Sequence, residues 1–130
     1  MAKQRIFISF DYDYDSDIKI MLAGQAKLED SPFDFTDASV KEHLTGDWKD
    51  KVKRRLKNCD QAIILCGEHT RNAVGVNEEL KIMQEIRLPY FLLSGRKEKS
   101  LKPSSALYND FMYKWEWPNL KALIGGARSK

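Results

Sequence analysis

The sequence predicts an α/β fold, with a central five-stranded parallel sheet covered by helices on both faces. Short apolar runs of strand type alternate with amphipathic segments of helical period along the 130 residues. No segment repeats another, and no shift in composition marks a second domain. Alternating strands and helices form βαβ units, whose crossovers lay helices on the faces of a parallel sheet. We therefore expect one three-layer domain over residues 1–130, ordered from about residue 4 to about residue 124.

The first half of the chain is expected to hold two strands and two helices. The strand at residues 5–9 is apolar at Ile6, Phe7 and Ile8, which indicates burial on both faces. Acidic residues and a serine follow it and suit the start of a helix. In the later basic run, the apolar residues recur with a helical period, so its lysines and arginines form a solvated face. The expected elements are a strand 5–9, a helix through Ile18, Met21, Leu22 and Leu28, a strand 33–35, a polar loop 36–46, and a helix 47–57 with a stripe of Trp48, Val52, Leu56 and Cys59.

The second half continues the alternation. Pro118 suits the first turn of a last helix, which Gly125 and Gly126 end. Trp115 and Trp117 alternate in the segment before it, and we interpret them as core and edge packing, with ligand stacking as the alternative. The expected elements are a strand 62–66, a helix around Glu79, a strand 89–93, a charged loop 95–105, an edge strand 113–117, a helix with Leu120, Leu123 and Ile124 inside, and a frayed tail 127–130. Five strands in this order favour a flavodoxin-like fold.

Composition excludes several classes of protein. No apolar run approaches the roughly 20 residues of a membrane span, and the N-terminus lacks the apolar stretch of a signal peptide. A formal charge of +3 is too small to indicate nucleic acid binding. Cys59 and Cys66 do not form a metal-ligand pattern, and both lie in or beside apolar segments. We expect buried, reduced thiols, no bound metal and a cytoplasmic location.

The functional site is expected at the carboxyl ends of the strands, because open α/β sheets bind ligands there. Those ends supply Ser9, Phe10 and Asp11 after the first strand, Thr36 and Asp37 after the second, and residues 67–72 after the third.

Glu79 is the most conspicuous residue of the chain. On a helical wheel drawn from Val76, it falls inside the apolar arc beside Met83 and Ile86. An ionised carboxylate that faces a core is costly unless something pairs with it, which points to a functional role. The alternative is a capping role, because carboxylates in the first helical turn complement the helix dipole, and the sequence places Glu79 in that turn.

Two established uses of a flavodoxin-like fold do not suit these residues. A flavodoxin cradles phosphate in a Gly- and Ser/Thr-rich loop after the first strand, whereas this loop is acidic and lacks glycine. A response-regulator receiver needs an Asp at the end of the third strand, where this chain has Cys66 and Gly67. Asp11 and Asp13 could still mimic the acidic pair that holds Mg²⁺ in such a receiver. Neither the P-loop nor the GxGxxG pattern occurs.

Four segments in order resemble a known family. The opening RIFISFDYDYD, the segment AIILCGEHT, the helix start VNEEL and the late YKWEWPNL are similar to the TIR-like domain of the bacterial Thoeris anti-phage proteins. The resemblance implies a flavodoxin-like fold. It also implies cleavage of NAD⁺ at the nicotinamide–ribose bond, with NAD⁺ as substrate and no further cofactor. The product would be an ADP-ribose-type messenger, linear or cyclic, that activates an effector protein. Family members build the active site between subunits, so self-association is implied as well.

By position, the resemblance puts the catalytic glutamate at Glu79. The loop after the first strand would lie against the nucleotide, and Phe10 or Tyr12 would stack on a ring. The implied substrate-binding residues are Ser9, Phe10, Asp11 and Tyr12, with Asp37, His69 and Asn72 as further polar candidates, each with a structural role as the alternative.

One position departs from the family. Relatives commonly carry an aromatic residue, usually Trp, four positions before the glutamate, and this chain has Gly75 there. Two hypotheses follow. The first is an NAD⁺-cleaving signalling enzyme that acts through Glu79. The second is a non-catalytic module of the same fold, which would bind a partner protein or a nucleotide. Gly75 and the acidic first loop favour the module, and the placement of Glu79 favours the enzyme.

Overall fold

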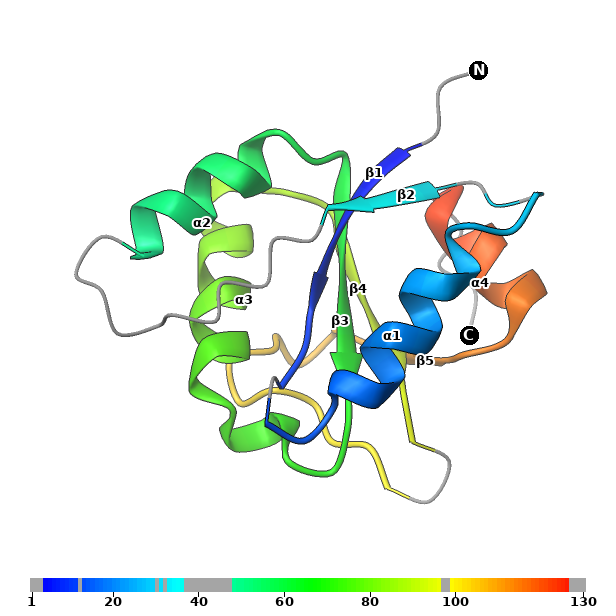
Figure 1. Ribbon diagram of the computed structural model, residues 1–130. Helices are drawn as coiled ribbons and strands as arrows, with labels where there is room; N and C mark the ends of the chain where they lie inside the picture. Colours follow the sequence, from blue (N-terminus) through cyan, green and yellow to red (C-terminus); the bar gives the residue numbers. More distant parts are fainter. Residues whose placement is uncertain are drawn as a thin grey trace.

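The computed structural model describes residues 4–11, 13–29, 31, 33–36, 48–96 and 99–126. Strands and helices alternate along these ranges (Figure 1). The elements are β1 (Gln4–Ser9), α1 (Ser16–Gln25), β2 (Phe33–Thr36), α2 (Trp48–Lys57), β3 (Gln61–Cys66), the 3₁₀ turn η1 (Thr70–Asn72), α3 (Val74–Ile86), β4 (Tyr90–Ser94), β5 (Met112–Lys114) and α4 (Trp117–Ile124).

The sheet confirms the predicted fold class. Its five strands are ordered β2-β1-β3-β4-β5, and every neighbouring pair is parallel. The chain passes from β1 outward to β2 and then returns to add β3 on the other side of β1. The direction of winding therefore reverses between β1 and β3, and such a switch point opens a crevice at the carboxyl ends of the two strands.

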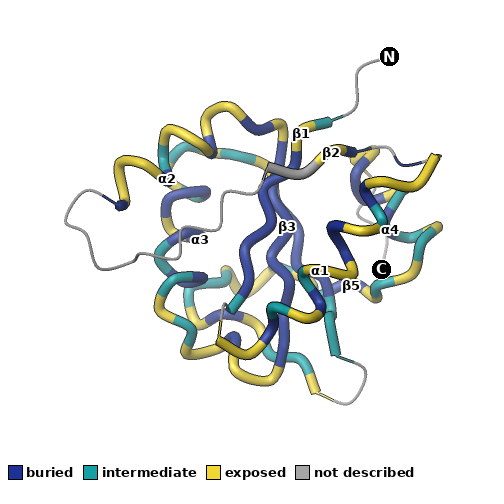
Figure 2. Tube along the Cα trace, in the orientation of Figure 1, coloured by how far each residue is buried: buried dark blue, intermediate teal, exposed yellow. Residues whose placement is uncertain are grey.

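Two helical layers cover the sheet. Helices α1 and α4 lie on one face, and α2 and α3 lie on the other (Figure 1). Alternate residues of each strand serve the two cores: Ile6 and Ile8 pack with the α1/α4 layer, whereas Phe7 packs with the α2/α3 layer. The central strand β3 is buried along its whole length (Figure 2). The predicted stripe of α2 is buried as expected, at Trp48, Val52, Leu56 and Cys59.

Helix α1 is shorter than predicted. It ends at Gln25, and the chain continues in tight turns, in which the amide of Leu28 donates to the carbonyl of Gln25 at 3.1 Å. Leu28 is therefore outside the helix and exposed. Met21 is 62% exposed, contrary to the prediction, because the buried face of this segment runs through Ile18, Leu22 and Ala26.

The last strand is also shorter than predicted. It ends at Lys114, whose carbonyl accepts a hydrogen bond from the amide of Glu116 at 3.1 Å and so turns the chain. Trp115 and Trp117 lie beyond the strand and pack against the α1/α4 core, and Trp117 opens α4. Pro118 sits in the first turn of α4, as predicted. The predicted loop beyond Thr36, up to residue 46, and the predicted tail 127–130 lie outside the described residues.

Candidate functional site at the carboxyl ends of β1 and β3

A cavity of about 480 Å³ opens at the switch point of the sheet. This volume is within the range of about 300–1,000 Å³ that is usual for small-molecule sites. Its walls are the loop after β1, the loop after β3, the start of α3 and one residue from the segment after β4. The lining residues are Phe10, Asp11, Asp13, Tyr14, Glu68, His69, Arg71, Asn72, Ala73, Val74, Gly75, Val76 and Leu101.

A buried pair of polar side chains lies beside this cavity. The Ser9 hydroxyl donates a 2.7 Å hydrogen bond to Glu79 Oε1, and Glu79 is only 4% exposed. Ser9 shares its strand face with Phe7, and that face looks toward α3. Neither Ser9 nor Glu79 is on the cavity wall, but their neighbours are: Phe10 follows Ser9, and Gly75 lies one turn before Glu79. The pair is therefore placed directly behind the lining.

Burial changes the titration of Glu79. Loss of solvent raises its pKa to about 8, against the opposing effect of the hydrogen bond from Ser9. At neutral pH the free protein consequently holds this carboxyl mainly in its protonated form. A cation that enters the cavity would favour the carboxylate by electrostatic attraction.

The position of Glu79 in its helix differs from the prediction. Helix α3 begins at Val74, so Glu79 lies in the second turn and not in the first. Val74 is 71% exposed, and for that reason the apolar pattern did not reveal the true start of the helix. The first turn contains no acidic residue, and Ala73, at the N-cap, makes no side-chain capping bond. The interpretation of Glu79 as a first-turn cap is therefore wrong.

The loop after β1 lines one side of the cavity. Phe10 is buried and Asp11 is partly exposed. Asp11 also shapes the loop, because its Oδ1 accepts from the amide of Asp13 at 3.1 Å and its carbonyl accepts from the amide of Asp15 at 2.8 Å. Tyr12 and Asp37, both candidates from the sequence, lie outside the described residues.

His69 and Asn72 line the opposite side, in the loop after β3. The imidazole of His69 stacks on the ring of Tyr14, with the ring centroids 3.7 Å apart and an angle of 25° between the planes. This stack joins the two loops across the mouth of the switch point. Tyr14 was not among the predicted site residues, although an aromatic ring in a loop after a central strand is a signal of such a role.

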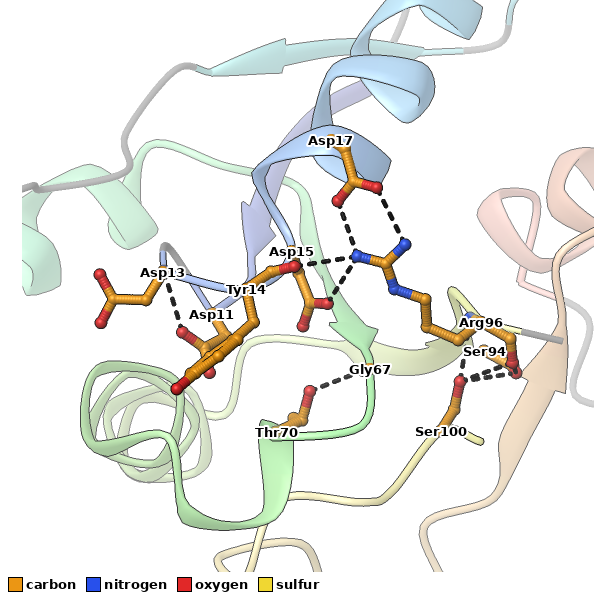
Figure 3. A network of polar contacts seen from close by, with 10 residues as sticks. All are labelled: Asp11, Asp13, Tyr14, Asp15, Asp17, Gly67, Thr70, Ser94, Arg96 and Ser100. Atoms are coloured by element: carbon orange, nitrogen blue, oxygen red, sulfur yellow. Dashed lines mark hydrogen bonds and ion pairs between the residues drawn. The ribbon is translucent and has the colours of Figure 1, made fainter. Parts of the chain in front are cut away.

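A second polar network braces the same loops from behind (Figure 3). Asp15 is 1% exposed, and its Oδ1 is 3.3 Å from Nη2 of Arg96. The Arg96 guanidinium also donates to both carboxylate oxygens of Asp17, at 2.9 and 2.7 Å, and to the carbonyl of Tyr14 at 2.9 Å. Burial raises the pKa of Asp15, although the charge of Arg96 opposes this effect. The loop after β4 thus holds the cavity-lining loop after β1 in place.

Gly67 permits the close approach of these loops. A Cβ at this position would overlap the carboxylate of Asp15. The Gly67 amide donates to Thr70 Oγ1 at 2.7 Å, which closes the turn that leads into η1. The sequence indicated only that Gly67 belongs to a polar loop. Asp15, the residue whose closeness requires a glycine here, is 52 residues earlier in the chain.

Possible metal ligands and the two cysteines were also located in the structure. In the described ranges, no group of three or more His, Cys, Asp or Glu side chains is arranged to hold a metal ion. Cys59 and Cys66 are buried free thiols, as expected, and burial raises the pKa of Cys66 to about 12. Such a thiol is not a nucleophile at neutral pH. No helix in the described part of the chain is both long and apolar enough to cross a membrane.

Comparison with known proteins connects this site to a family. Residues 7–95 match the family described as "Thoeris protein ThsB, TIR-like domain". The fold resembles the crystal structure of a prokaryotic SEFIR domain, with a TM-score of 0.59 and 14% identity over 94% of this chain and 92% of that one. A glutaminase domain of Trypanosoma brucei CTPS with bound acivicin matches more loosely, with a TM-score of 0.45 and 17% identity over 72% of this chain and 37% of that one. No curated protein matches the chain.

The match covers every residue that lines the cavity except Leu101. The family region runs from within β1 to the residue after β4, and so includes both loops of the switch point and the whole of α3. The chain therefore belongs to the Thoeris TIR-like family, and it is a TIR-type signalling domain of a defence system.

Proposed function

We propose that this chain cleaves NAD⁺ at the nicotinamide–ribose bond, and that Glu79 is its catalytic residue. The observation that carries the proposal is the buried carboxyl of Glu79, held by Ser9 at 2.7 Å directly behind a 480 Å³ cavity. Buried carboxyls with a raised pKa are concentrated at functional sites. Membership of the Thoeris TIR-like family adds independent support, because the resemblance implies this chemistry.

The chemistry suits a carboxylate. Breaking the N-glycosidic bond sends its electron pair to the pyridinium ring, so nicotinamide leaves as a neutral molecule and no general acid is required. The ribose is left with the character of an oxocarbenium ion, as in glycoside cleavage. Glu79 lies behind the lining in the free protein, so the proposal requires the start of α3 to shift when substrate binds and to open the carboxylate to the ribose. There the carboxylate stabilises that positive charge and accepts hydrogen bonds from ribose hydroxyls, and exclusion of water strengthens the effect. Attack by water then gives ADP-ribose, and attack by an atom of the nucleotide itself gives a cyclic product.

Binding of the cationic substrate favours the ionised, carboxylate form of Glu79. Glu79 has a pKa of about 8 in the free protein. The nicotinamide ring of NAD⁺ is a cation, and its arrival beside the carboxyl favours loss of the proton. The Ser9 hydroxyl stays hydrogen-bonded to Oε1 and keeps the carboxyl in one orientation. Binding and proton release are therefore coupled, and the charged group forms only when the substrate is there to pair with it.

A second candidate function is that of a non-catalytic interaction module. Gly75 lines the cavity at the position where relatives commonly have an aromatic ring, and this observation favours the module. A wall without that ring leaves the ribose site more open to water, which lowers the rate of cleavage. Assembly of two chains could close the site, consistent with the self-association that the resemblance implies. In either function the chain would act through a separate effector protein.

Nicotinamide release tests the proposal. Concentrated purified protein, and protein taken from phage-infected cells, are incubated with NAD⁺, and nicotinamide is measured by chromatography. Glu79→Gln keeps the shape of the side chain and removes its charge. Glu85→Gln is the matched control, because Glu85 is exposed on the same helix and pairs with Lys53 at 3.1 Å. Release by the wild type and Glu85→Gln but not by Glu79→Gln is expected. If none of the three proteins releases nicotinamide, and Glu79→Gln is folded, the interaction module is left as the function.

A further inference from the structure

We infer that Arg71 binds the diphosphate of the nucleotide and selects for ligands that carry one. This inference rests on the proposed function, because it assigns a recognition role within the same cavity. Arg71 lines the cavity in η1, in the loop after β3.

Arg71 differs in charge from the other charged side chains of the cavity wall. Among the described lining residues, three carboxylates, Asp11, Asp13 and Glu68, face the ligand space. Arg71 contributes the one guanidinium of that set, and no lysine lines the described wall. A diphosphate is repelled by the carboxylates, and a cation within hydrogen-bond distance offsets that repulsion. The start of α3, which also lines the cavity, offers backbone N–H groups to a phosphate, and Arg71 is the side chain of the described wall that adds a full positive charge.

The guanidinium of Arg71 is available to a ligand. The side chain is exposed, and no carboxylate in the described ranges forms an ion pair with it. Arg96, by contrast, is engaged in ion pairs with Asp15 and Asp17. An exposed guanidinium on the wall of a cavity whose other charged lining residues are carboxylates suits the bidentate binding of phosphate.

The backbone beneath Arg71 is held firmly. Its carbonyl accepts two hydrogen bonds, from Asn77 Nδ2 at 3.1 Å and from the amide of Ser104 at 3.2 Å. Asn77 is itself buried, and it also donates to the carbonyl of Ala73 at 2.9 Å and accepts from the amide of Ser105 at 2.8 Å. Asn77 is therefore a positioning residue that clamps η1 between α3 and the segment after β4. Because the backbone of η1 is already fixed, binding has to order only the side chain of Arg71, which keeps the entropy lost on binding low.

Equilibrium binding separates this inference from the cleavage activity. Calorimetry measures the affinity of the wild type for ADP-ribose, which has the diphosphate and lacks nicotinamide. Loss of one charge-assisted bidentate contact predicts that Arg71→Gln weakens ADP-ribose binding by about 10- to 100-fold. Arg71→Lys should recover part of the loss. Arg54→Gln is the matched control, because Arg54 is exposed on α2, away from the cavity, and this variant should bind as the wild type does.

Kinetics with two substrates give the second readout. With NAD⁺, Arg71→Gln should raise KM by a similar factor and change kcat by less than about threefold, since Arg71 does not touch the bond that breaks. With nicotinamide riboside, which lacks phosphate, Arg71→Gln and the wild type should turn over alike. An equal loss with both substrates would assign Arg71 to general folding of the loop and overturn the inference.

The two proposals fail in different ways. If the wild type binds ADP-ribose through Arg71 but releases no nicotinamide, the cleavage function is wrong and the role of Arg71 stands. If Arg71→Gln binds ADP-ribose with wild-type affinity, the inference about Arg71 is wrong and the cleavage function is unaffected. If the wild type neither binds ADP-ribose nor cleaves NAD⁺, both are wrong.

Discussion

The hydroxyl of Ser9 and the carboxyl of Glu79 are 70 residues apart in sequence and 2.7 Å apart in the folded chain. Ser9 ends the strand β1, and Glu79 lies on the inner face of α3, which covers that strand. Their contact connects the switch point of the sheet to the only buried glutamate in the described ranges.

Stability should fall as the pH rises from about 4.5 to about 8, because the Glu79 carboxyl ionises in the unfolded chain before it ionises in the folded protein. Its pKa is about 8 in the folded protein and about 4.5 when it is unperturbed. Because the folded pKa is the higher one, its contribution to stability is full below about pH 4.5 and is lost as the pH rises toward 8. Each unit of pKa difference corresponds to about 1.4 kcal/mol. The melting temperature of the wild type should therefore drop relative to Glu79→Gln across this window. Glu85→Gln should follow the wild type, and parallel profiles for all three proteins would contradict the raised pKa.

Removal of the Ser9 hydroxyl should disturb Glu79 in two ways. Ser9→Ala leaves a buried carboxyl without its hydrogen bond, which should lower the free energy of unfolding by about 1–3 kcal/mol near pH 7. The hydrogen bond also lowers the pKa of Glu79, so the variant should shift the ionisation of Glu79 to higher pH. Chemical denaturation and the pH dependence of stability measure the two effects. The same loss in a Glu79→Leu background, which offers the hydroxyl no acceptor, would show that the hydroxyl acts elsewhere.

A side chain at Gly67 should be tolerated only when Asp15 is removed. Gly67→Ala forces its Cβ into the Asp15 carboxylate, and overpacking of this kind costs about 1–3 kcal/mol. In an Asp15→Ala background the cost should largely vanish, since the overlapping atoms are gone. The control is Gly24→Ala in α1, where a Cβ meets nothing within 4 Å, and a gain of up to about 1 kcal/mol is expected. Denaturant unfolding of the double-mutant cycle measures the coupling, and additive costs would refute the close contact.

Arg96 should matter far more to stability than its exposed partner Asp17. Arg96→Met leaves the 1%-exposed carboxylate of Asp15 without its cation, and loss of one partner of a buried charge costs about 3 kcal/mol or more. Asp17→Asn breaks only an exposed pair, which contributes about 0–1 kcal/mol. Urea unfolding at pH 7 compares the two variants. Equal losses would mean that Asp15 does not depend on Arg96.

Periodic features of the sequence predicted the fold correctly. The apolar runs of β1 and β3 and the stripe of α2 each follow one clear period, and burial of these residues is what determines the layers. The errors occurred where local bonds end an element: α1 stops at Gln25 in tight turns, and β5 stops at Lys114. Helix α3 starts at Val74, earlier than predicted. Val74 points away from the core, so it lies outside the apolar arc from which the helix was predicted.

The site was predictable only in part. A helical wheel places Glu79 inward, and the strand order places Phe10, Asp11, His69 and Asn72 near one another; all four line the cavity. The partners of these residues depend on tertiary contacts that no local period encodes. The bond from Ser9 to Glu79, the ion pair between Asp15 and Arg96, and the bonds of Asn77 Oδ1 to Ser104 and Ser105 each join segments that are distant in sequence.

The pH dependence of kcat/KM for nicotinamide release is the most direct test of the central claim, that the buried carboxylate of Glu79 performs the cleavage. This ratio reports the ionisation of the free protein. We expect kcat/KM to rise about tenfold per pH unit at lower pH and to level off near the Glu79 pKa of about 8. A profile that stays flat from pH 5 to pH 8, or a Glu79→Gln variant that retains the wild-type rate, would contradict it.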